Sequence, residues 1–417
     1  MAFKQFSSSV TLHQALEPPL LLDDIGLPRY WATVRAAVSS RDLAVSTETK
    51  NLRHIEALYV FADDLKYQGF LDDTLTQCDF GELGSLLEAY FISLKNRPKL
   101  TDSAQKQWRT GLSFIRDVVT GLGKNAAAHS GLAHVEAQLL RLDAAYSQLK
   151  IQKRRRPATL RALPAEVVSW LYETLDPESP TNPFKRQITR WRVFTAFVIM
   201  LHEGLRRGEM LLLPVDAVKT GFDSKTQCDR HWINIQSLET DDKEAGVKVN
   251  VDKRFNKPSI KTSDSIRQIP VSKLTANVIQ SYADNYRGKP DHPFLLNSQK
   301  NLALSHESLT TYFTRISAQL PASVRKLLHD RNNKESIEPH DLRHTCAVVR
   351  LNQMLAEGTS MAVAVPGLRA FFGWSIDSDM PMRYARAVFE DRNANIWARI
   401  QDDRIELLQA IPKGRNK

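Results

Sequence analysis

Hydrophobic residues recur at helical spacing through the first third of the chain. Between residues 27 and 149, apolar side chains return every three or four positions in successive segments, and glycines stand near several segment ends. The segment "STETKNLRHIEALYVFADDL" is typical, with Ser46 expected as its N-cap. This pattern predicts an all-helical domain over residues 27–149. Residues 1–26 carry Ser and Pro clusters and are expected to form a flexible N-terminal arm.

The pattern changes after a basic, proline-containing segment at residues 150–163, which we interpret as an interdomain linker. Beyond it, over residues 164–417, helical segments flank short runs with strand character at 231–236, 247–252, 258–262 and 266–271. The sequence therefore predicts a mainly α fold with a small antiparallel β-hairpin or sheet. It places a helical N-terminal domain before an α+β domain that ends in a C-terminal helix.

The overall charge directs attention to polyanions. The 417 residues include 57 basic and 47 acidic side chains, a formal net charge of +10, within an ordinary globular composition. The cluster Lys153, Arg154, Arg155 and Arg156 in the linker suits a solvated tether, a nuclear address or a segment lying along phosphates. Its place between two basic domains favours DNA.

Cysteine content and apolar runs bound the compartment. The three cysteines are far apart and form neither a disulfide framework nor a CxxC metal pattern, which fits a reducing cytosol. The start of the chain lacks an apolar core of signal-peptide length, and "VFTAFVIML" is too short to span a bilayer. We expect a cytoplasmic protein that has no membrane partner.

The stretch "PHDLRHT" at 339–345 opens an apolar run and carries the most suggestive chemistry. His340 and Arg343 share a helix face there, within about 5–6 Å at their Cβ atoms. Three interpretations compete: a metal site using His340 and His344, a phosphate-binding site, or a helix start with incidental charges. Further ligands at metal-binding spacing are not evident in the sequence, so we expect no metal.

Three more stretches place reactive side chains at element ends. In "HEGLRRGEM", Glu209 can pair with a buried Arg206 or cap the next helix, although a surface salt bridge is the simpler interpretation. Lys261 lies at the mouth of the apparent hairpin, where lysines are ordinarily solvated. Trp374 and Tyr384, in "GWSIDSDMPMRYAR", are residue types that most often serve packing.

The two arginines, the lysine, the histidine, the tryptophan and the tyrosine of these stretches can all donate hydrogen bonds to phosphate oxygens. A phosphodiester under in-line attack gains negative charge that guanidinium groups can neutralise. The set also offers a general acid and a nucleophile.

The order of these motifs resembles the tyrosine recombinases, or phage integrase family. The matching stretches are "GLRRGE" (204–209), "KTSDSIRQIP" (261–270), "HDLRHT" (340–345), "FFGW" (371–374) and "MRY" (382–384). The resemblance covers residues 164 to about 400, and the helical first part resembles the family's core-binding DNA-binding domain more loosely. It implies a site-specific DNA recombinase, or integrase, that cleaves and rejoins strands through a 3′-phosphotyrosine intermediate without metal, ATP or other cofactor.

The resemblance also implies roles for individual residues. Arg206 and Arg343 would hold the scissile phosphate, and Glu209 would support the fold around Arg206. Lys261 would protonate the leaving 5′ oxygen, although Lys253 or Lys257 remains an alternative.

The remaining roles concern the nucleophile. His340 would manage the proton of the nucleophile Tyr384 and hydrogen-bond the phosphate. Trp374 stands where many members have a second histidine, and its indole N–H can donate to a non-bridging oxygen. His344 would support the helix start or the neighbouring tyrosine.

The implied partner is double-stranded DNA. We expect a monomer or dimer in the free state and a homotetramer in the synaptic complex, in a bacterial-type, nucleoid-associated setting on a mobile genetic element, with accessory DNA-bending proteins as further partners. The segment 387–411 is a predicted helix that would dock on a neighbouring protomer or on its own domain. Two alternatives stay open: a type IB topoisomerase-like enzyme that cleaves and rejoins DNA, and an inactive DNA-binding relative.

Overall fold

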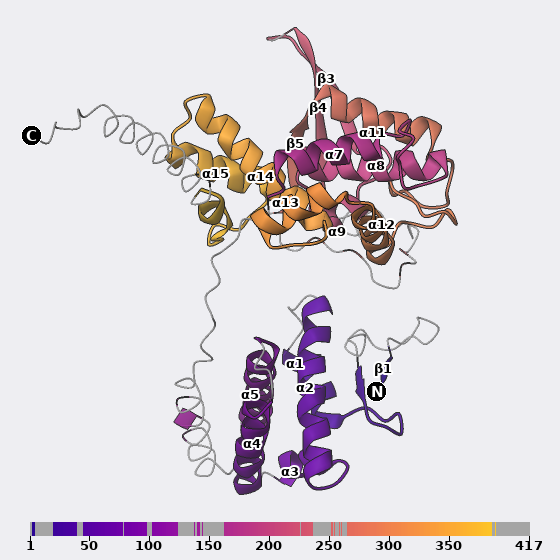
Figure 1. Cartoon of the computed structure of the whole chain (residues 1–417). Helices are drawn as coiled ribbons and strands as arrows, with labels where there is room; N and C mark the ends of the chain where they lie inside the picture. The colour runs from indigo at the N-terminus through magenta and orange to yellow at the C-terminus, as the bar shows by residue number, and fades with distance from the viewer. Residues whose placement is uncertain are drawn as a thin grey trace, which may run out of the picture. The chain divides into compact units, whose positions relative to one another are not determined.

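The chain divides into two compact units, Met1–Arg154 and Arg155–Lys417, which we call the N-terminal and C-terminal units (Figure 1). The division falls inside the segment interpreted as a linker. The computed structural model describes residues 2–4, 20–39, 45–77, 79–97, 102–123, 137, 140, 141, 144, 162–225, 227–236, 252, 254, 258, 260, 265–385 and 388. Among these residues, no helix has the length and apolar character needed to cross a membrane.

The N-terminal unit is mainly helical over its described residues. Its elements are β1 (Ala2–Lys4), β2 (Leu20–Leu22), α1 (Tyr30–Ser39), α2 (Val45–Leu65), α3 (Phe70–Gln77), α4 (Phe80–Lys95) and α5 (Asp102–Gly123). The apolar residues that recur at helical spacing in α2 form part of the core of this unit. Leu52, Ile55 and Leu58 are each at most 1% exposed. Helix α2 begins at Val45, so Ser46 lies inside its first turn and is not the N-cap that we expected.

The segment expected to be a loose arm is partly built into this unit. Strand β1 pairs antiparallel with β2, and Leu21 in β2 is 2% exposed within the same core as α2. The physical reason is the run of leucines after the prolines, which has enough apolar surface to be buried. The expectation of a flexible arm over residues 1–26 is therefore wrong for residues 2–4 and 20–22.

The C-terminal unit combines helices with one small sheet. Its elements are α7 (Ala165–Leu175), α8 (Gln187–His202), α9 (Arg207–Leu211), β3 (Val218–Asp223), β4 (Cys228–Ile235), β5 (Arg267–Val271), α11 (Lys273–Asn285), α12 (His306–Ala318), α13 (Ala322–Asn332), α14 (Pro339–Ala356) and α15 (Met361–Phe372). The strands form an antiparallel sheet in the order β3-β4-β5, with Ile233 opposite Val218 and Ile269. The predicted fold class, mainly α with a small antiparallel sheet, is confirmed.

The sheet differs from the predicted strands in one place. Strands β4 and β5 coincide closely with the runs at 231–236 and 266–271, whereas β3 was not predicted. No residue of β3 is fully buried, so the strand lacks the apolar alternation that marks a half-buried strand. The runs at 247–252 and 258–262 lie mostly outside the described residues.

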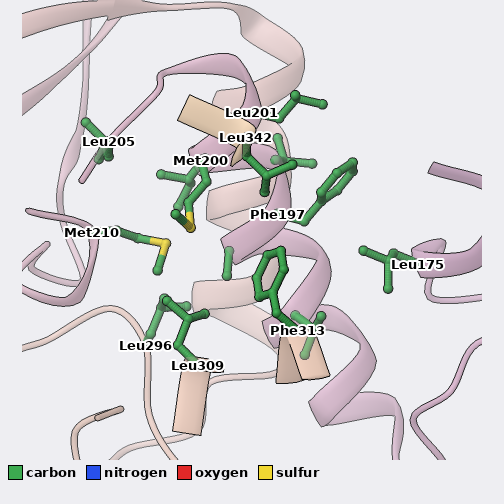
Figure 2. Packing of buried hydrophobic residues seen from close by; sticks show 14 of the residues in the cluster. Leu175, Phe197, Met200, Leu201, Leu205, Met210, Leu296, Leu309, Phe313 and Leu342 are labelled. Carbon is green, nitrogen blue, oxygen red and sulfur yellow. The ribbon is translucent and has the colours of Figure 1, made fainter. Parts of the chain in front are cut away.

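Helix α8 runs through the centre of the C-terminal core. Between Val193 and Leu201 it is almost entirely apolar, which is the pattern of a buried helical segment, and Phe197 and Ile199 are completely buried. Figure 2 shows Phe197 and Met200 of α8 among side chains from other elements, including Phe313 of α12 and Leu342 of α14. Because α14 packs on α8, the start of "PHDLRHT" is fixed against the end of α8.

Gly204 ends α8 in a conformation that only glycine adopts easily. Its φ is +59°, and a Cβ built there would lie 2.4 Å from Cε1 of Phe372 and 3.1 Å from Sγ of Cys346. The missing side chain thus lets the ends of α8 and α15 approach each other beside α14. The candidate site forms at this junction.

Candidate active site

The junction begins with Arg206, the N-cap of α9. Its backbone N–H donates to Oε2 of Glu209 at 2.9 Å, and its Nη1 donates to Oε1 of the same carboxylate at 2.6 Å. The side chain of Glu209 is 1% exposed. Glu209 therefore does both things that the sequence allowed: it pairs with Arg206 and caps the helix.

Two further arginines converge on Glu209. Arg267 donates from Nη1 and Nη2 to its two oxygens at 3.3 and 3.2 Å, and Nη1 of Arg343 lies 3.7 Å from Oε2. Burial by itself would raise the pKa of the Glu209 carboxyl, but the guanidinium groups of Arg267, Arg343 and Arg206 outweigh it and hold that pKa below its usual value. Counting these four groups, three positive charges face one negative charge.

Arg267 was not among the predicted site residues. It lies inside the motif "KTSDSIRQIP" and is the first residue of β5. The available indication was that an arginine opening a strand with a buried face needs a buried anion or carbonyl partners.

The C-terminal end of α15 holds the same three guanidinium groups through consecutive backbone carbonyls. Phe371 O accepts from Nε of Arg267 at 2.7 Å, and Phe372 O accepts from Nη2 of Arg343 at 2.8 Å. Gly373 O accepts from Nη2 of Arg206 at 2.9 Å. These carbonyls have no partner within the helix and carry the negative end of its dipole, so they suit cations.

The three arginines differ in exposure. Arg343 has a side chain only 2% exposed, and its Nη1 also donates to Gly204 O at 2.5 Å. Burial and the nearby charge of Arg206 lower the pKa of Arg343 to about 9, which leaves it charged at neutral pH. The side chain of Arg206 is 22% exposed and also donates to Oγ of Ser265 at 2.8 Å. Arg206 is thus the most solvent-accessible of the three.

Three aromatic rings are stacked beside the arginines. Phe372 stacks on Trp374 with ring centroids 4.7 Å apart, and Trp374 stacks on Tyr384 at 5.5 Å. The guanidinium carbon of Arg343 lies 5.0 Å from the Phe372 centroid and 5.6 Å from that of Trp374. Trp374 and Tyr384 are both buried, so the fold brings Trp374, Tyr384 and Arg343 together.

The hydroxyl of Tyr384 has a specific partner in the buried His344. Its Oη is hydrogen-bonded to Nδ1 of His344, which comes from the first turns of α14. The ring of His340 lies edge-on to that of His344, with centroids 4.5 Å apart, and His340 is exposed. The exposed His340 thus contacts the buried His344, which in turn contacts the tyrosine hydroxyl.

The start of α14 is held by carboxylates of its own. Asp341 accepts from the backbone N–H of Glu338 at 2.8 Å and from Nζ of Lys334 at 2.5 Å, and Glu338 is the N-cap. Pro339 occupies the first turn, as the sequence predicted. Within the described residues, no group of three His, Cys, Asp or Glu side chains could hold a metal ion. Asp341 thus caps the start of α14, because its carboxylate accepts from the backbone N–H of Glu338.

Several predicted site residues lie outside the described part of the chain. They are Lys153, Arg154, Arg155, Arg156, Lys253, Lys257 and Lys261, together with the predicted helix 387–411 except for Val388. The segment that carries Lys261 re-enters the described structure at Ser265, whose hydroxyl accepts from Arg206. The roles of these residues stay predictions.

Comparison with known proteins agrees with the motifs. The model of the phage integrase family matches residues 161–390, which is more than half of the chain. The chain belongs to the phage integrase family. It is accordingly an enzyme of the tyrosine-type site-specific DNA recombinase class. No curated protein matches the sequence.

Solved structures similar to the chain include site-specific recombinases. The crystal structure of XerA recombinase is 13% identical, with 82% of this chain and 98% of that chain covered and a TM-score of 0.34. The post-cleavage complex of XerH with a palindromic difH substrate is 13% identical, with 88% and 85% covered and a TM-score of 0.48. The pre-cleavage complex of XerH is 14% identical, with 88% and 93% covered and a TM-score of 0.35.

Proposed function

We propose that this recombinase cleaves one DNA strand at a time through a covalent 3′-phosphotyrosine link to Tyr384 and then reseals the strand, without metal or ATP. The observation that carries the proposal is the buried cluster of Arg206, Arg267 and Arg343 around the single carboxylate of Glu209. An excess of positive charge next to a buried tyrosine hydroxyl is stabilised when an anion binds. A phosphodiester whose charge increases in the transition state is such an anion.

In the proposed reaction the Tyr384 oxygen attacks phosphorus, the bond from phosphorus to the 5′ oxygen breaks, and the tyrosine proton passes to a base. His344 touches the hydroxyl, so it is suited to orient it and to receive the proton. His340, exposed beside His344, hydrogen-bonds the phosphate or relays that proton. Lys261 protonates the leaving 5′ oxygen, and four residues after it in the same motif Ser265 accepts a hydrogen bond from Arg206.

The phosphate is held by Arg206 and Arg343, while Glu209 and Arg267 fix their geometry. Trp374 supports this arrangement by its stacking between Phe372 and Tyr384, and its indole N–H donates to a non-bridging oxygen. Because the phosphotyrosine bond retains the energy of the phosphodiester, the 5′ hydroxyl of another strand can attack it and restore DNA. Arg343 touches both the aromatic stack and Glu209, so it links the nucleophile to the phosphate-binding arginines.

The proposed partners are double-stranded DNA, further copies of this chain and accessory proteins. Double-stranded DNA binds to both units, with the N-terminal unit as a core-binding domain and Lys153–Arg156 along the backbone phosphates. Affinity then falls steeply with salt. Four protomers assemble on DNA, with the segment 387–411 docking between neighbours and accessory proteins bending the DNA. The protein acts on the nucleoid in a bacterial-type cell.

A covalent-trapping experiment tests the chemistry. Wild type is incubated in EDTA with nicked duplexes made from the DNA that flanks its gene, labelled at the 5′ end of the cleaved strand, and adducts are separated in detergent. We expect a labelled protein–DNA adduct, because a 3′-phosphotyrosine link retains the 5′-labelled fragment. Tyr384→Phe should form none.

The matched control is Tyr282→Phe, which removes another buried hydroxyl of the same unit, one that donates to Asn297 at 2.7 Å. This variant should form the adduct as wild type does. An adduct that persists in Tyr384→Phe would contradict the assignment of the nucleophile. An adduct that is labelled only when the label is placed at the 3′ end of the cleaved strand would contradict the proposed polarity.

A further inference from the structure

A second ion pair, between the partly exposed Arg350 and the buried Glu203, lies next to the arginine cluster and has no part in the proposed chemistry. Nη2 of Arg350 donates to His202 O at 2.9 Å and to Oε2 of Glu203 at 3.2 Å. Its guanidinium carbon lies 3.7 Å from the ring centroid of Phe371. The Glu203 side chain is 2% exposed, and a carboxylate that is buried in this way lowers stability unless ion pairing and hydrogen bonds offset its desolvation.

Arg350 repeats the contacts of Arg343 two turns further along α14. The seven-residue spacing puts both side chains on the same helix face. Arg343 donates to Gly204 O in the turn after α8 and to Phe372 O at the end of α15. Arg350 contacts the residues just before these, namely Glu203 in the turn and Phe371 at the helix end.

The two segments that Arg350 joins are those that carry the phosphate-binding groups. The turn after α8 leads from Glu203 directly to Gly204 and Arg206. The end of α15 supplies the carbonyls of Phe371, Phe372 and Gly373 that hold the three guanidinium groups. A change in the separation of these segments would therefore move Arg206 and Arg343 relative to each other.

We infer that Arg350 and Glu203 form a positioning pair, which sets the spacing of Arg206 and Arg343 for the scissile phosphate without touching it. This inference rests on the proposed function, since it concerns the same phosphate. Glu203 orients the Arg350 guanidinium by accepting from it, and the Phe371 ring supports the guanidinium plane from one side. The pair thus ties α8, α14 and α15 together at the site.

The test compares rates of adduct formation on saturating nicked duplex with affinity for the uncleaved duplex. In the double variant Arg350→Met with Glu203→Gln, neither charge is left buried alone. We expect its cleavage rate to fall on the order of 10-fold to 100-fold, because small displacements of positioned groups have effects of that size. Its affinity should match wild type, since one phosphate among many contributes little to binding.

Two further variants separate positioning from loss of stability. Arg350→Lys retains the charge and can donate to one acceptor, so it should recover part of the lost rate. Leu328→Ala empties a fully buried position on α13 away from the site and should cleave at the wild-type rate while folded. Circular dichroism confirms the folded fraction of each variant at the assay temperature.

The outcomes are distinct for the two proposals. A double variant that cleaves at the wild-type rate, or that is slowed no more than Leu328→Ala, overturns the positioning role while wild-type adducts still support the proposed function. A wild type that forms no adduct overturns the proposed function, and the positioning role is overturned with it. A slow double variant with intact affinity and partial rescue by Arg350→Lys supports both.

Discussion

The two units of this recombinase differ in how their arginines are paired with acidic side chains. In the N-terminal unit, each arginine has its own acidic partner: Arg29 pairs with Asp63, and Arg35 pairs with Asp117 at 2.9 Å, where the Asp117 side chain is 34% exposed. Nη1 of Arg35 also lies 3.7 Å from Oε1 of the buried Glu48. In the C-terminal unit, the carboxylate of Glu209 is 1% exposed and faces three arginines. One unit neutralises its charges, whereas the other buries an excess of positive charge.

This difference indicates that the arginine cluster around Glu209 is suited to an anionic ligand. A buried excess of charge lowers stability, because desolvation is only partly offset by the available partners. The fold tolerates it through backbone carbonyls at the end of α15 and one shared carboxylate. Stability alone would favour the matched pairs of the N-terminal unit, so the unmatched charge is best explained by the phosphate that it is proposed to bind.

The largest expected effect comes from removing the shared carboxylate. Glu209→Leu leaves three guanidinium groups facing one another without an anion, and we expect it to lower the free energy of unfolding of the C-terminal unit by about 3–5 kcal/mol. The comparable change in the N-terminal unit, Asp117→Asn, breaks a partly exposed pair and should lower stability by about 0–1 kcal/mol. Scanning calorimetry of the whole chain measures both. Equal losses in the two variants would remove the contrast between the units.

A second effect concerns pH. Burial raises the pKa of the Glu203 carboxyl from 4.5 to about 7, although the charge of Arg350 and a hydrogen bond with Thr275 act to lower it. Because the folded state retains a proton that the unfolded chain has lost, stability is fully present below pH 4.5 and falls as pH rises towards 7. The total loss is about 3 kcal/mol.

Glu203→Gln should remove this slope, and denaturant unfolding between pH 5 and 8 measures the difference from wild type. The charged and titratable groups around Glu203 are Arg350 and Cys346 from α14 and the neighbouring His202, and they are the same in both proteins. His202 has its pKa lowered by burial and by Arg350, so its own contribution has the opposite sign and cancels in the comparison. Parallel pH profiles would show that Glu203 does not titrate as described.

The smallest expected difference, about 1–3 kcal/mol, is that between two glycines with positive φ. Gly204→Ala should be destabilising through both backbone strain and overlap with Phe372, whereas Gly69→Ala, at φ +88° in the N-terminal unit, has no atom within 4 Å of the new Cβ. Strain by itself is worth about 1–2 kcal/mol, and overlap should add about 1–3 kcal/mol for Gly204 only. Thermal unfolding of both variants gives the difference. Equal destabilisation would mean that the ends of α8 and α15 can separate freely.

Local features of this protein could be predicted from its sequence. The helical spacing of α2, the apolar run in α8 and the start of α14 at Pro339 each depend on neighbours within a few residues, so the pattern reports them directly. The five motifs in order also indicated the family to which the chain belongs. The pairing of Arg206 with Glu209 could be predicted for the same reason, because Glu209 is the third residue after Arg206 at the start of one helix.

The tertiary structure alone decided which distant groups meet. Arg267 joins the site through Glu209 and Phe371, which are far from it in sequence, and its place at the start of a strand does not identify these partners. The same holds for Arg350, whose partners precede it by more than a hundred residues. Periodicity records which side of an element is buried, whereas the identity of the partner depends on how the chain packs those sides together.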